Sequence, residues 1–158
     1  MIEPMQGMES AENSTGWRIH PVLLNHILME YRYVDHEIGG VLGLRCGTVI
    51  RSIKDTEGYS DARIYRSNPD RIAAAIRSLL QADKCDQICF IHSHPSEHPS
   101  PSYADIRFVR LFLQMNPMFE NAGMAIVAGN TLNMFCLYRS SYEIAPSPMG
   151  RFLGSVAE

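Results

Sequence analysis

Hydrophobic residues return at helical spacing in three separate segments of the chain. Residues 21–34, 71–84 and 102–115 carry apolar side chains three or four positions apart, with polar side chains between them. This spacing gathers the apolar residues on one face, which is typical of an amphipathic helix packed on a core. Pro21 and Pro69 stand where the first two segments begin, and the first turn of a helix tolerates proline. The pattern predicts three helices.

Shorter apolar runs between these segments are typical of strands. Glycine, proline and acidic residues bound them, and the run that ends at His92 is continuously apolar, as in a strand inside a sheet. Residues 56–61 and the pair Gly129-Asn130 indicate turns between strands. The predicted strands cover residues 37–44, 47–55, 62–67, 85–92, 123–130 and 131–139.

The order of these elements indicates an α/β or α+β domain. Helices and groups of strands alternate along the chain, which favours one mixed sheet with the three helices packed on it. At 158 residues the chain suits a single domain with one core. We assign the domain to residues 17–144, with a flexible N-terminal tail at 1–16 and a C-terminal tail at 145–158 that crosses the surface.

Charge and composition argue against several classes of partner. The net charge of -3 lacks the basic excess of a protein that binds the phosphate backbone, so we expect no nucleic-acid partner. No secretion signal precedes Arg18, and no apolar run approaches the roughly 18 residues of a membrane helix. We therefore expect a cytoplasmic protein without a membrane partner.

The four cysteines are expected to be reduced and partly buried thiols. They are scattered through predicted strands, and a chain without a secretion signal is expected in a reducing compartment. Cys85 and Cys89 resemble one half of a metal site, but the second close pair of a zinc-binding set is absent from the sequence.

The segment FIHSHPSEHPSPSYAD, residues 90–105, carries the candidate chemistry. In a strand, residues two apart point to the same face, so His92 and His94 stand side by side. A catalytic zinc site uses three protein ligands, commonly imidazole nitrogens and a carboxylate, and leaves one position to water. Asp105 is the natural third ligand, because the proline-rich loop can turn the chain so that the next helix faces the histidines.

Each fragment of this segment has a plainer interpretation. Two histidines at a strand end are commonly just partly exposed side chains. Ser102 followed three residues later by Asp105 is an ordinary capping box at a helix start. Their joint occurrence favours the metal site, because a capping box does not require two histidines upstream. His98 lies in the same loop and is either a further ligand or a loop residue.

A metal-activated water also requires a base, and Glu37 is the candidate. It heads the apolar segment 37–44, which has no other charge before Arg45. Gly39, Gly40 and Gly43 in this segment suit a close approach between strands or to a bound chain. The alternative is an exposed carboxylate in a turn between helix and strand.

Taken together, these residues resemble the JAMM motif of the MPN (Mov34/PAD-1) metalloprotease family. Glu37 is followed by His92-Ser93-His94-Pro95, then six residues, Ser102, two residues and Asp105, and no element of the motif is absent. The resemblance extends roughly from Trp17 to Tyr142. It implies a cytidine-deaminase-like core, a zinc ion held by His92, His94 and Asp105, Glu37 as general acid and base, and Ser102 as an oxyanion donor.

The resemblance also implies an activity, which is hydrolysis of an isopeptide or peptide bond at the C-terminus of ubiquitin or a ubiquitin-like protein. The segments between the motif elements are short, as in compact prokaryotic members, some of which accompany E1-like and E2-like proteins in antiphage systems. For the substrate, we expect an extended C-terminal peptide to add to a sheet edge within residues 48–66, with small residues flanking the cleaved bond.

Three other functions are alternatives to this one. A zinc deaminase requires a histidine-glutamate motif followed by a pair of cysteines, and here the cysteines precede the histidines. A non-catalytic binding scaffold with structural zinc would close the site with four protein ligands, whereas three and a base are present. A third alternative keeps the enzyme and changes its substrate to a sulfur-carrier protein or a small peptide.

Overall fold

The computed structural model describes residues 16–56, 58–60, 65–140 and 146–154 of the chain. Within these residues it has three helices and nine strands, of which seven form one sheet. The helices are α1 (Pro21–Tyr31), α2 (Pro69–Gln81) and α3 (Tyr103–Met115). The strands are β1 (Arg18–Ile19), β2 (Gly39–Arg45), β3 (Thr48–Lys54), β4 (Tyr59–Ser60), β5 (Tyr65–Arg66), β6 (Gln87–Ser93), β7 (Asn121–Ala128), β8 (Thr131–Tyr138) and β9 (Ser147–Leu153).

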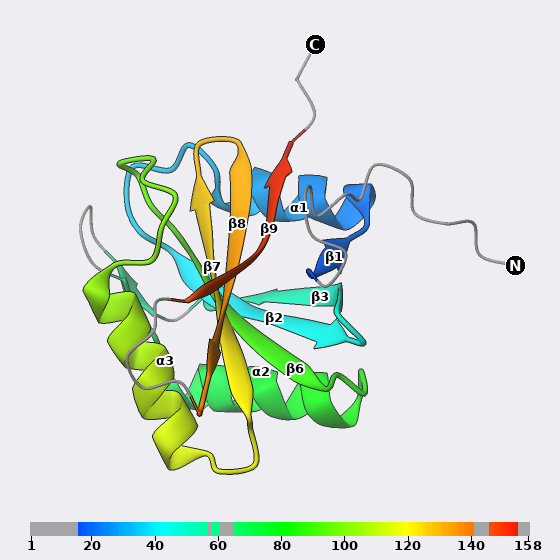
Figure 1. Ribbon diagram of the computed structural model, residues 1–158. Coiled ribbons are helices and arrows are strands. Elements are labelled where there is room, and N and C mark those ends of the chain that lie inside the picture. The colour runs from blue at the N-terminus through cyan, green and yellow to red at the C-terminus, as the bar shows by residue number, and fades with distance from the viewer. Residues whose placement is uncertain (1–15, 57, 61–64, 141–145, 155–158) are drawn as a thin grey trace, which may run out of the picture.

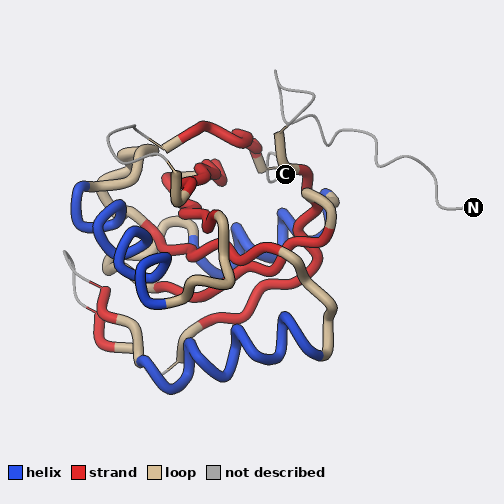
Figure 2. The backbone as a smooth tube through the Cα atoms, turned by 60° about the horizontal axis from the view of Figure 1, so that its bottom comes forward, coloured by secondary structure: helices blue, strands red, loops and turns tan. Residues whose placement is uncertain are grey.

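The main sheet is mixed, as predicted. Its strands lie in the order β1-β3-β2-β6-β7-β8-β9, and only the pairs β1–β3 and β6–β7 are parallel. The parallel pair β6–β7 requires a crossover connection, and α3 provides it. Helix α1 lies on one face of the sheet, and α2 and α3 lie on the other (Figures 1 and 2). The predicted fold class is confirmed.

Each face of the sheet has its own apolar core. Leu24, Ile27 and Leu28 of α1 pack with Leu42 and other residues that point to that side. On the opposite side, α2 and α3 pack with strand residues of the alternate positions. In β6, Cys89 and Ile91 face α1, whereas Ile88 and Phe90 face α2 and α3. This alternation assigns the two faces of β6 and therefore fixes where its histidines point.

The three helices are confirmed, with a correction at the end of the first. Helix α1 ends at Tyr31, and Arg32 already has an extended backbone with ψ 151°. Tyr33 then adopts φ 56°, a left-handed conformation that a helix cannot continue through. The apolar spacing up to Val34 therefore overestimated the helix. No helix in the described ranges is long and apolar enough to cross a membrane.

The predicted turn at 56–61 is wrong in part, because it contains a short strand. Tyr59 and Ser60 form β4 and pair with β5 in a separate two-stranded sheet. The predicted strand at 62–67 is confirmed only at Tyr65–Arg66, since residues 61–64 lie outside the described ranges. The turn at Gly129-Asn130 is confirmed, and Gly129 supplies its left-handed φ of 58°.

Residues 147–153 form strand β9 of the sheet, which corrects the predicted tail at 145–158 over that range. Strand β9 pairs antiparallel with β8 at one edge of the sheet, where Pro148 is tolerated because an edge strand has one side without partners. At the other edge, the amide of Trp17 donates to the carbonyl of Met149 over 2.8 Å, so the two edges approach each other. The predicted tail at 1–16 lies outside the described ranges except for Gly16.

The cysteines are free thiols, and three of the four are buried. Cys89 belongs to the core beneath α1, whereas Cys85 belongs to the core beneath α2 and α3. Burial raises the pKa of both thiols above the ordinary value, which keeps them neutral. The sheet separates the two side chains, so they do not form half of a metal site.

Candidate metal centre

His92 and His94 lie at the end of β6, on the face that α3 covers. His92 occupies a strand position alternate to the α1-facing ones, and His94 follows it two residues later, just beyond the end of β6. Their ring centroids are 4.7 Å apart. The sequence prediction that both imidazoles point the same way is confirmed.

Ser93, between the two histidines, points the other way and ties β6 to the segment that carries Glu37. Its Oγ accepts a hydrogen bond from the amide of Ile38 over 3.0 Å and donates to the carbonyl of His36 over 3.3 Å. Ser93 is only 1% exposed, so these bonds are shielded from water. No role for this serine was predicted from the sequence, although a hydroxyl between two histidines at a strand end is a signal that could have revealed it.

Asp105 reaches the histidines from the first turn of α3. Ser102 is the N-cap of this helix, and the two residues form the predicted capping box. The amide of Asp105 donates to Ser102 Oγ over 3.1 Å, and the amide of Ser102 donates to Asp105 Oδ2 over 2.7 Å. The cap fixes the carboxylate of Asp105 so that Oδ1 lies 2.7 Å from His92 Nε2 and Oδ2 lies 3.4 Å from His94 Nε2.

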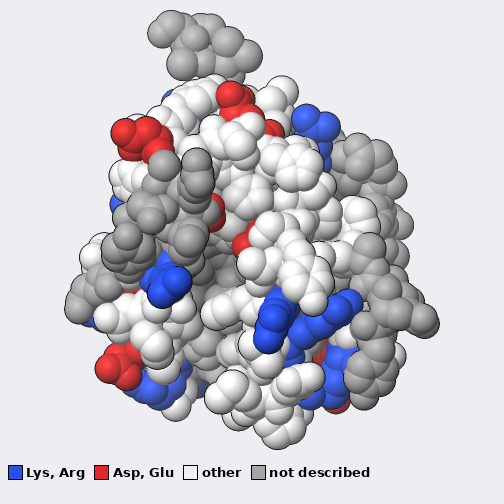
Figure 3. Space-filling view, turned by 90° about the vertical axis from the view of Figure 1, so that its left-hand side faces the viewer, with Lys and Arg blue, Asp and Glu red and all other residues white. Residues whose placement is uncertain are grey.

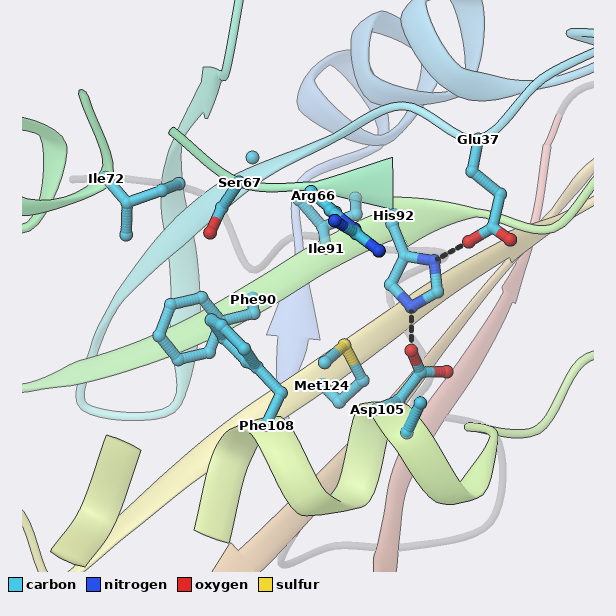
Figure 4. A pocket seen from close by; sticks show the side chains of 12 residues that line it. Glu37, Arg66, Ser67, Ile72, Phe90, Ile91, His92, Asp105, Phe108 and Met124 are labelled. Atoms are coloured by element: carbon cyan, nitrogen blue, oxygen red, sulfur yellow. Dashed lines mark ion pairs between the residues drawn. The ribbon is translucent and has the colours of Figure 1, made fainter. Parts of the chain in front are cut away.

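Glu37 approaches His92 from the opposite side of the ring, as Figure 4 shows. Its Oε1 lies 3.1 Å from His92 Nδ1. Glu37 stands in the connection before β2, two residues from Gly39, which pairs with His92 across the β2–β6 ladder. The ladder and the bonds of Ser93 together place this carboxylate beside the histidine, although 55 residues separate the two in sequence.

The loop after β6 selects the tautomer of His94. Its Nδ1 lies 2.8 Å from the backbone carbonyl oxygen of His98, which can only accept, so Nδ1 carries the hydrogen. The lone pair of the neutral ring is therefore on Nε2, the atom that faces Asp105. A metal-bound histidine commonly donates its other ring N–H to a carbonyl in this way. His98 thus serves the site through its carbonyl, and its side chain is exposed.

The charges of the site are strongly coupled. Burial opposes the protonated form of His92, but the carboxylates of Asp105 and Glu37 outweigh it and raise the pKa of His92 to about 9. Burial likewise opposes ionisation of Asp105, and the two histidines and the amide of Ser102 lower its pKa well below the ordinary value. A positive charge among these groups is therefore favoured.

The donor set fits a divalent metal ion. Ligand atoms of Glu37, His92 and His94 lie within 4.8 Å of one another. His92 Nε2 is buried and has no hydrogen bond of acceptable geometry, although Asp105 Oδ1 lies near it. Tetrahedral zinc with bonds of about 2.0 to 2.1 Å separates its ligand atoms by about 3.3 Å. The separations of 2.7 Å from His92 Nε2 to Asp105 Oδ1 and 3.4 Å from His94 Nε2 to Asp105 Oδ2 are near this value.

Two carboxylates compete for the third ligand position. Asp105 contacts Nε2 of both histidines, whereas the contact of Glu37 is with Nδ1 of His92. Because the loop leaves Nε2 of His94 as its free nitrogen, an ion between the two Nε2 atoms is closest to Asp105. On this ground Asp105 stays the predicted third ligand and Glu37 the predicted base.

A cavity of about 300 Å³ opens beside these residues. His92 and Asp105 form one end, and apolar side chains from α2, α3, β6 and β7 form much of the rest. Figure 3 shows the side of the molecule that carries α3, where Asp and Glu atoms lie within a recess flanked by Lys and Arg atoms. The cavity lies directly beside the candidate metal centre, since Glu37, His92 and Asp105 line it.

The structure brings together all five residues predicted from sequence, namely Glu37, His92, His94, Ser102 and Asp105. Their individual roles stay predictions. No curated protein matches the sequence. The family described as prokaryotic homologs of the JAB domain matches residues 20–139, a range that contains the whole candidate site. By that match over most of its length, the chain belongs to the prokaryotic branch of the JAB (JAMM/MPN) domain family.

Proposed function

We propose that the protein is a zinc-dependent peptidase or isopeptidase that cleaves after the C-terminus of a ubiquitin or ubiquitin-like protein. The observation that carries this proposal is the convergence of two imidazole Nε2 atoms on the carboxylate of Asp105, beside an open cavity and a second carboxylate. A structural zinc site would be closed by four protein ligands, whereas an open fourth position suits catalysis.

In this proposal His92, His94 and Asp105 hold the ion. When bound there, zinc supplies polarisation of the scissile carbonyl and lowers the pKa of its water toward about 7. Glu37 takes a proton from the water as its oxygen bonds to the carbonyl carbon. Glu37 then gives this proton to the leaving nitrogen as the carbon–nitrogen bond breaks, so that one residue serves as base and then as acid.

Ser102 is proposed to stabilise the oxyanion. Its Oγ already accepts the amide hydrogen of Asp105, so its own hydroxyl hydrogen is free to donate elsewhere. Ser102 stands at the start of α3, where the helix dipole also favours negative charge. A donor aimed at the developing negative oxygen is typically worth a factor of about 100 to 1,000 in kcat.

The proposed substrate is an extended C-terminal tail. Strand β1 pairs with β3 only at Thr48 and Val49, which leaves the outer edge of Ile50–Lys54 without a strand partner among the described residues. Lys54 pairs with Gly40 on the other side, so this edge ends close to the segment of Glu37. A tail added there by backbone hydrogen bonds would lead toward the metal centre.

The proposed activity also suggests the pathway in which the protein works. A deconjugating or precursor-processing enzyme of this kind would work with E1-like and E2-like proteins, for example in a bacterial antiphage pathway. Two alternatives use the same site differently. The substrate is a sulfur-carrier protein or small peptide in the first, and in the second the domain is a non-catalytic scaffold.

Metal content and cleavage together test the proposal. Purified protein should contain one zinc per chain and cleave a ubiquitin-like protein extended at its C-terminus, with the position read by mass spectrometry. Glu37→Gln should retain zinc and lose about 100- to 10,000-fold in kcat. Zinc retention without cleavage of any fusion or peptide by the unmodified protein would support the scaffold instead.

A further inference from the structure

The cavity beside the metal centre is lined by large apolar side chains. Ile72, Phe90, Phe108 and Met124 form its wall, and Phe90 and Phe108 pack edge to face with centroids 4.9 Å apart. The sequence predicted small residues on both sides of the cleaved bond. A cavity of about 300 Å³ with this lining instead suits a bulky apolar side chain on one side of the bond.

One cation reaches into this apolar space. Arg66 of β5 lines the cavity, and its guanidinium points between Phe90 and His92 (Figure 4). Arg66 makes no ion pair or side-chain hydrogen bond with any residue in the described ranges. The hydroxyl of Ser67 lines the same wall and is likewise without a partner there. The wall therefore offers hydrogen-bond donors that no acceptor in the described part of the protein uses.

The charge balance of the site favours an anion at Arg66. The carboxylates of Glu37 and Asp105 carry two negative charges, which a divalent ion balances. Arg66 then contributes one further positive charge at the rim of the cavity; its side chain is exposed, and no carboxylate in the described part of the chain balances it. A guanidinium binds a carboxylate through two parallel hydrogen bonds, which adds geometric selection to charge attraction.

We infer that this cavity binds an apolar C-terminal residue of the substrate, with its α-carboxylate on Arg66 and its side chain against Phe90, Phe108 and Met124. This inference rests on the proposed hydrolysis and specifies the leaving group. Water adds its oxygen to the carbonyl carbon, the bond to the α-nitrogen of the last residue breaks, and the proton goes to that nitrogen. The products are a shortened chain and one free apolar amino acid. An isopeptide-linked lysine lacks a carboxylate near its leaving nitrogen.

Peptides that differ only at the last carboxyl group test the inference. Zinc-loaded protein is given one peptide that ends in Gly-Gly-Leu, the same peptide as C-terminal amide, and a Gly-Gly isopeptide on lysine. The free acid should be cleaved with a kcat/KM roughly 10- to 100-fold above the amide, the ordinary range for a charge-assisted hydrogen bond. Equal cleavage of acid and amide, or preference for the isopeptide, overturns the inference and leaves the proposed function intact.

Three variants test whether Arg66 causes the preference for the free acid over the amide. Arg66→Met should abolish the preference for the acid over the amide, while Arg66→Lys should keep part of it because the charge is retained. Arg77→Gln removes an exposed arginine of α2 that does not line the cavity, and it should leave the preference unchanged. A preference that survives Arg66→Met in a folded protein contradicts the assignment.

Binding of the leaving group gives a readout that does not need catalysis. In NMR titrations of zinc-loaded protein, L-leucine should shift resonances of residues at the cavity at lower concentration than L-leucinamide, and Arg66→Met should remove the difference. Equal binding of the two compounds, or binding of neither in the millimolar range, contradicts the inference. Absence of cleavage of every substrate together with selective binding of leucine instead contradicts only the proposed catalysis.

Discussion

The backbone carbonyl of His98 lies 2.8 Å from Nδ1 of His94, so the loop after β6 orients one of the candidate zinc ligands. In this relationship His94 is the candidate ligand, and His98 only orients it through its backbone carbonyl. His98→Ala keeps the carbonyl and should leave zinc affinity nearly unchanged. His94→Ala removes a predicted ligand and should lower the affinity by at least the 10- to 100-fold typical of losing an outer partner. Competition with a chromophoric chelator measures both, and a large loss in His98→Ala would show that its imidazole binds the ion.

A second prediction concerns which carboxylate completes the site. Asp105→Asn replaces the group that contacts Nε2 of both histidines, and it should lose zinc stoichiometry on dialysis. Glu37→Gln changes a group that contacts only Nδ1 of His92, and it should keep the metal. Elemental analysis of the two purified variants shows which of the two carboxylates zinc binding requires. The reverse result would make Glu37 the third ligand and Asp105 an outer residue.

Ser102 is expected to have two separable roles. Ser102→Ala removes the N-cap of α3 and should lower the free energy of unfolding by about 1 kcal/mol. In the proposed enzyme it should also lower kcat by roughly 100-fold or more through loss of the oxyanion donor. Asn68→Ala is the matched control, because Asn68 caps α2 by accepting from the amides of Asp70 and Arg71. It should cost similar stability in urea denaturation and leave kcat unchanged.

Local patterns predicted much of this site because its residues obey short-range rules. Two imidazoles two residues apart in a strand share a face, and a serine three residues before an aspartate forms a capping box. Glu37 was a candidate base because it heads an apolar segment, but the sequence left an exposed turn carboxylate as an equal alternative. The β2–β6 ladder and the bonds of Ser93 that place Glu37 beside His92 join distant segments, so local patterns do not reveal them.

Other features of the fold could not be predicted from the sequence because they depend on tertiary contacts. Strand β9 contains Pro148 and Gly150, which disfavour a strand by themselves. The segment is nevertheless a strand because it pairs with the edge of β8. Helix α1 ends early because Tyr33 takes a left-handed backbone, which apolar spacing does not reveal. The cavity beside the metal centre and the direction of Arg66 arise only once α2, α3 and β5 surround the end of β6.

The raised pKa of His92 predicts how stability depends on pH. In the metal-free protein its pKa is about 9, above the ordinary 6.5, so protonated His92 stabilises the fold fully below pH 6.5. This contribution, of the order of 3 kcal/mol, should disappear as the pH rises through 9. Zinc requires the neutral ring, so zinc binding should release protons and strengthen over the same range.

Thermal melts of the metal-free and zinc-loaded forms between pH 6 and 10 measure this dependence. The gap between their melting temperatures should widen as the pH rises. His26→Gln changes an exposed histidine of α1 and should leave both profiles as they were. A metal-free protein with the same stability at pH 6.5 and pH 9.5 would mean that His92 titrates normally.

The last prediction concerns Gly43, which the sequence analysis expected to permit close approach. A Cβ at this position would lie 2.5 Å from Cys85 Sγ and 2.7 Å from a methyl carbon of Leu79, so the glycine lets α2 and the start of β6 pack on β2. Gly43→Ala should therefore destabilise the fold by about 1 to 3 kcal/mol. Because Cys85→Ala removes one of the two clashing atoms, the double variant should be more stable than the sum of the single effects predicts. Strict additivity in urea denaturation would contradict the packing described here, since it would mean that the two side chains do not compete for the same space.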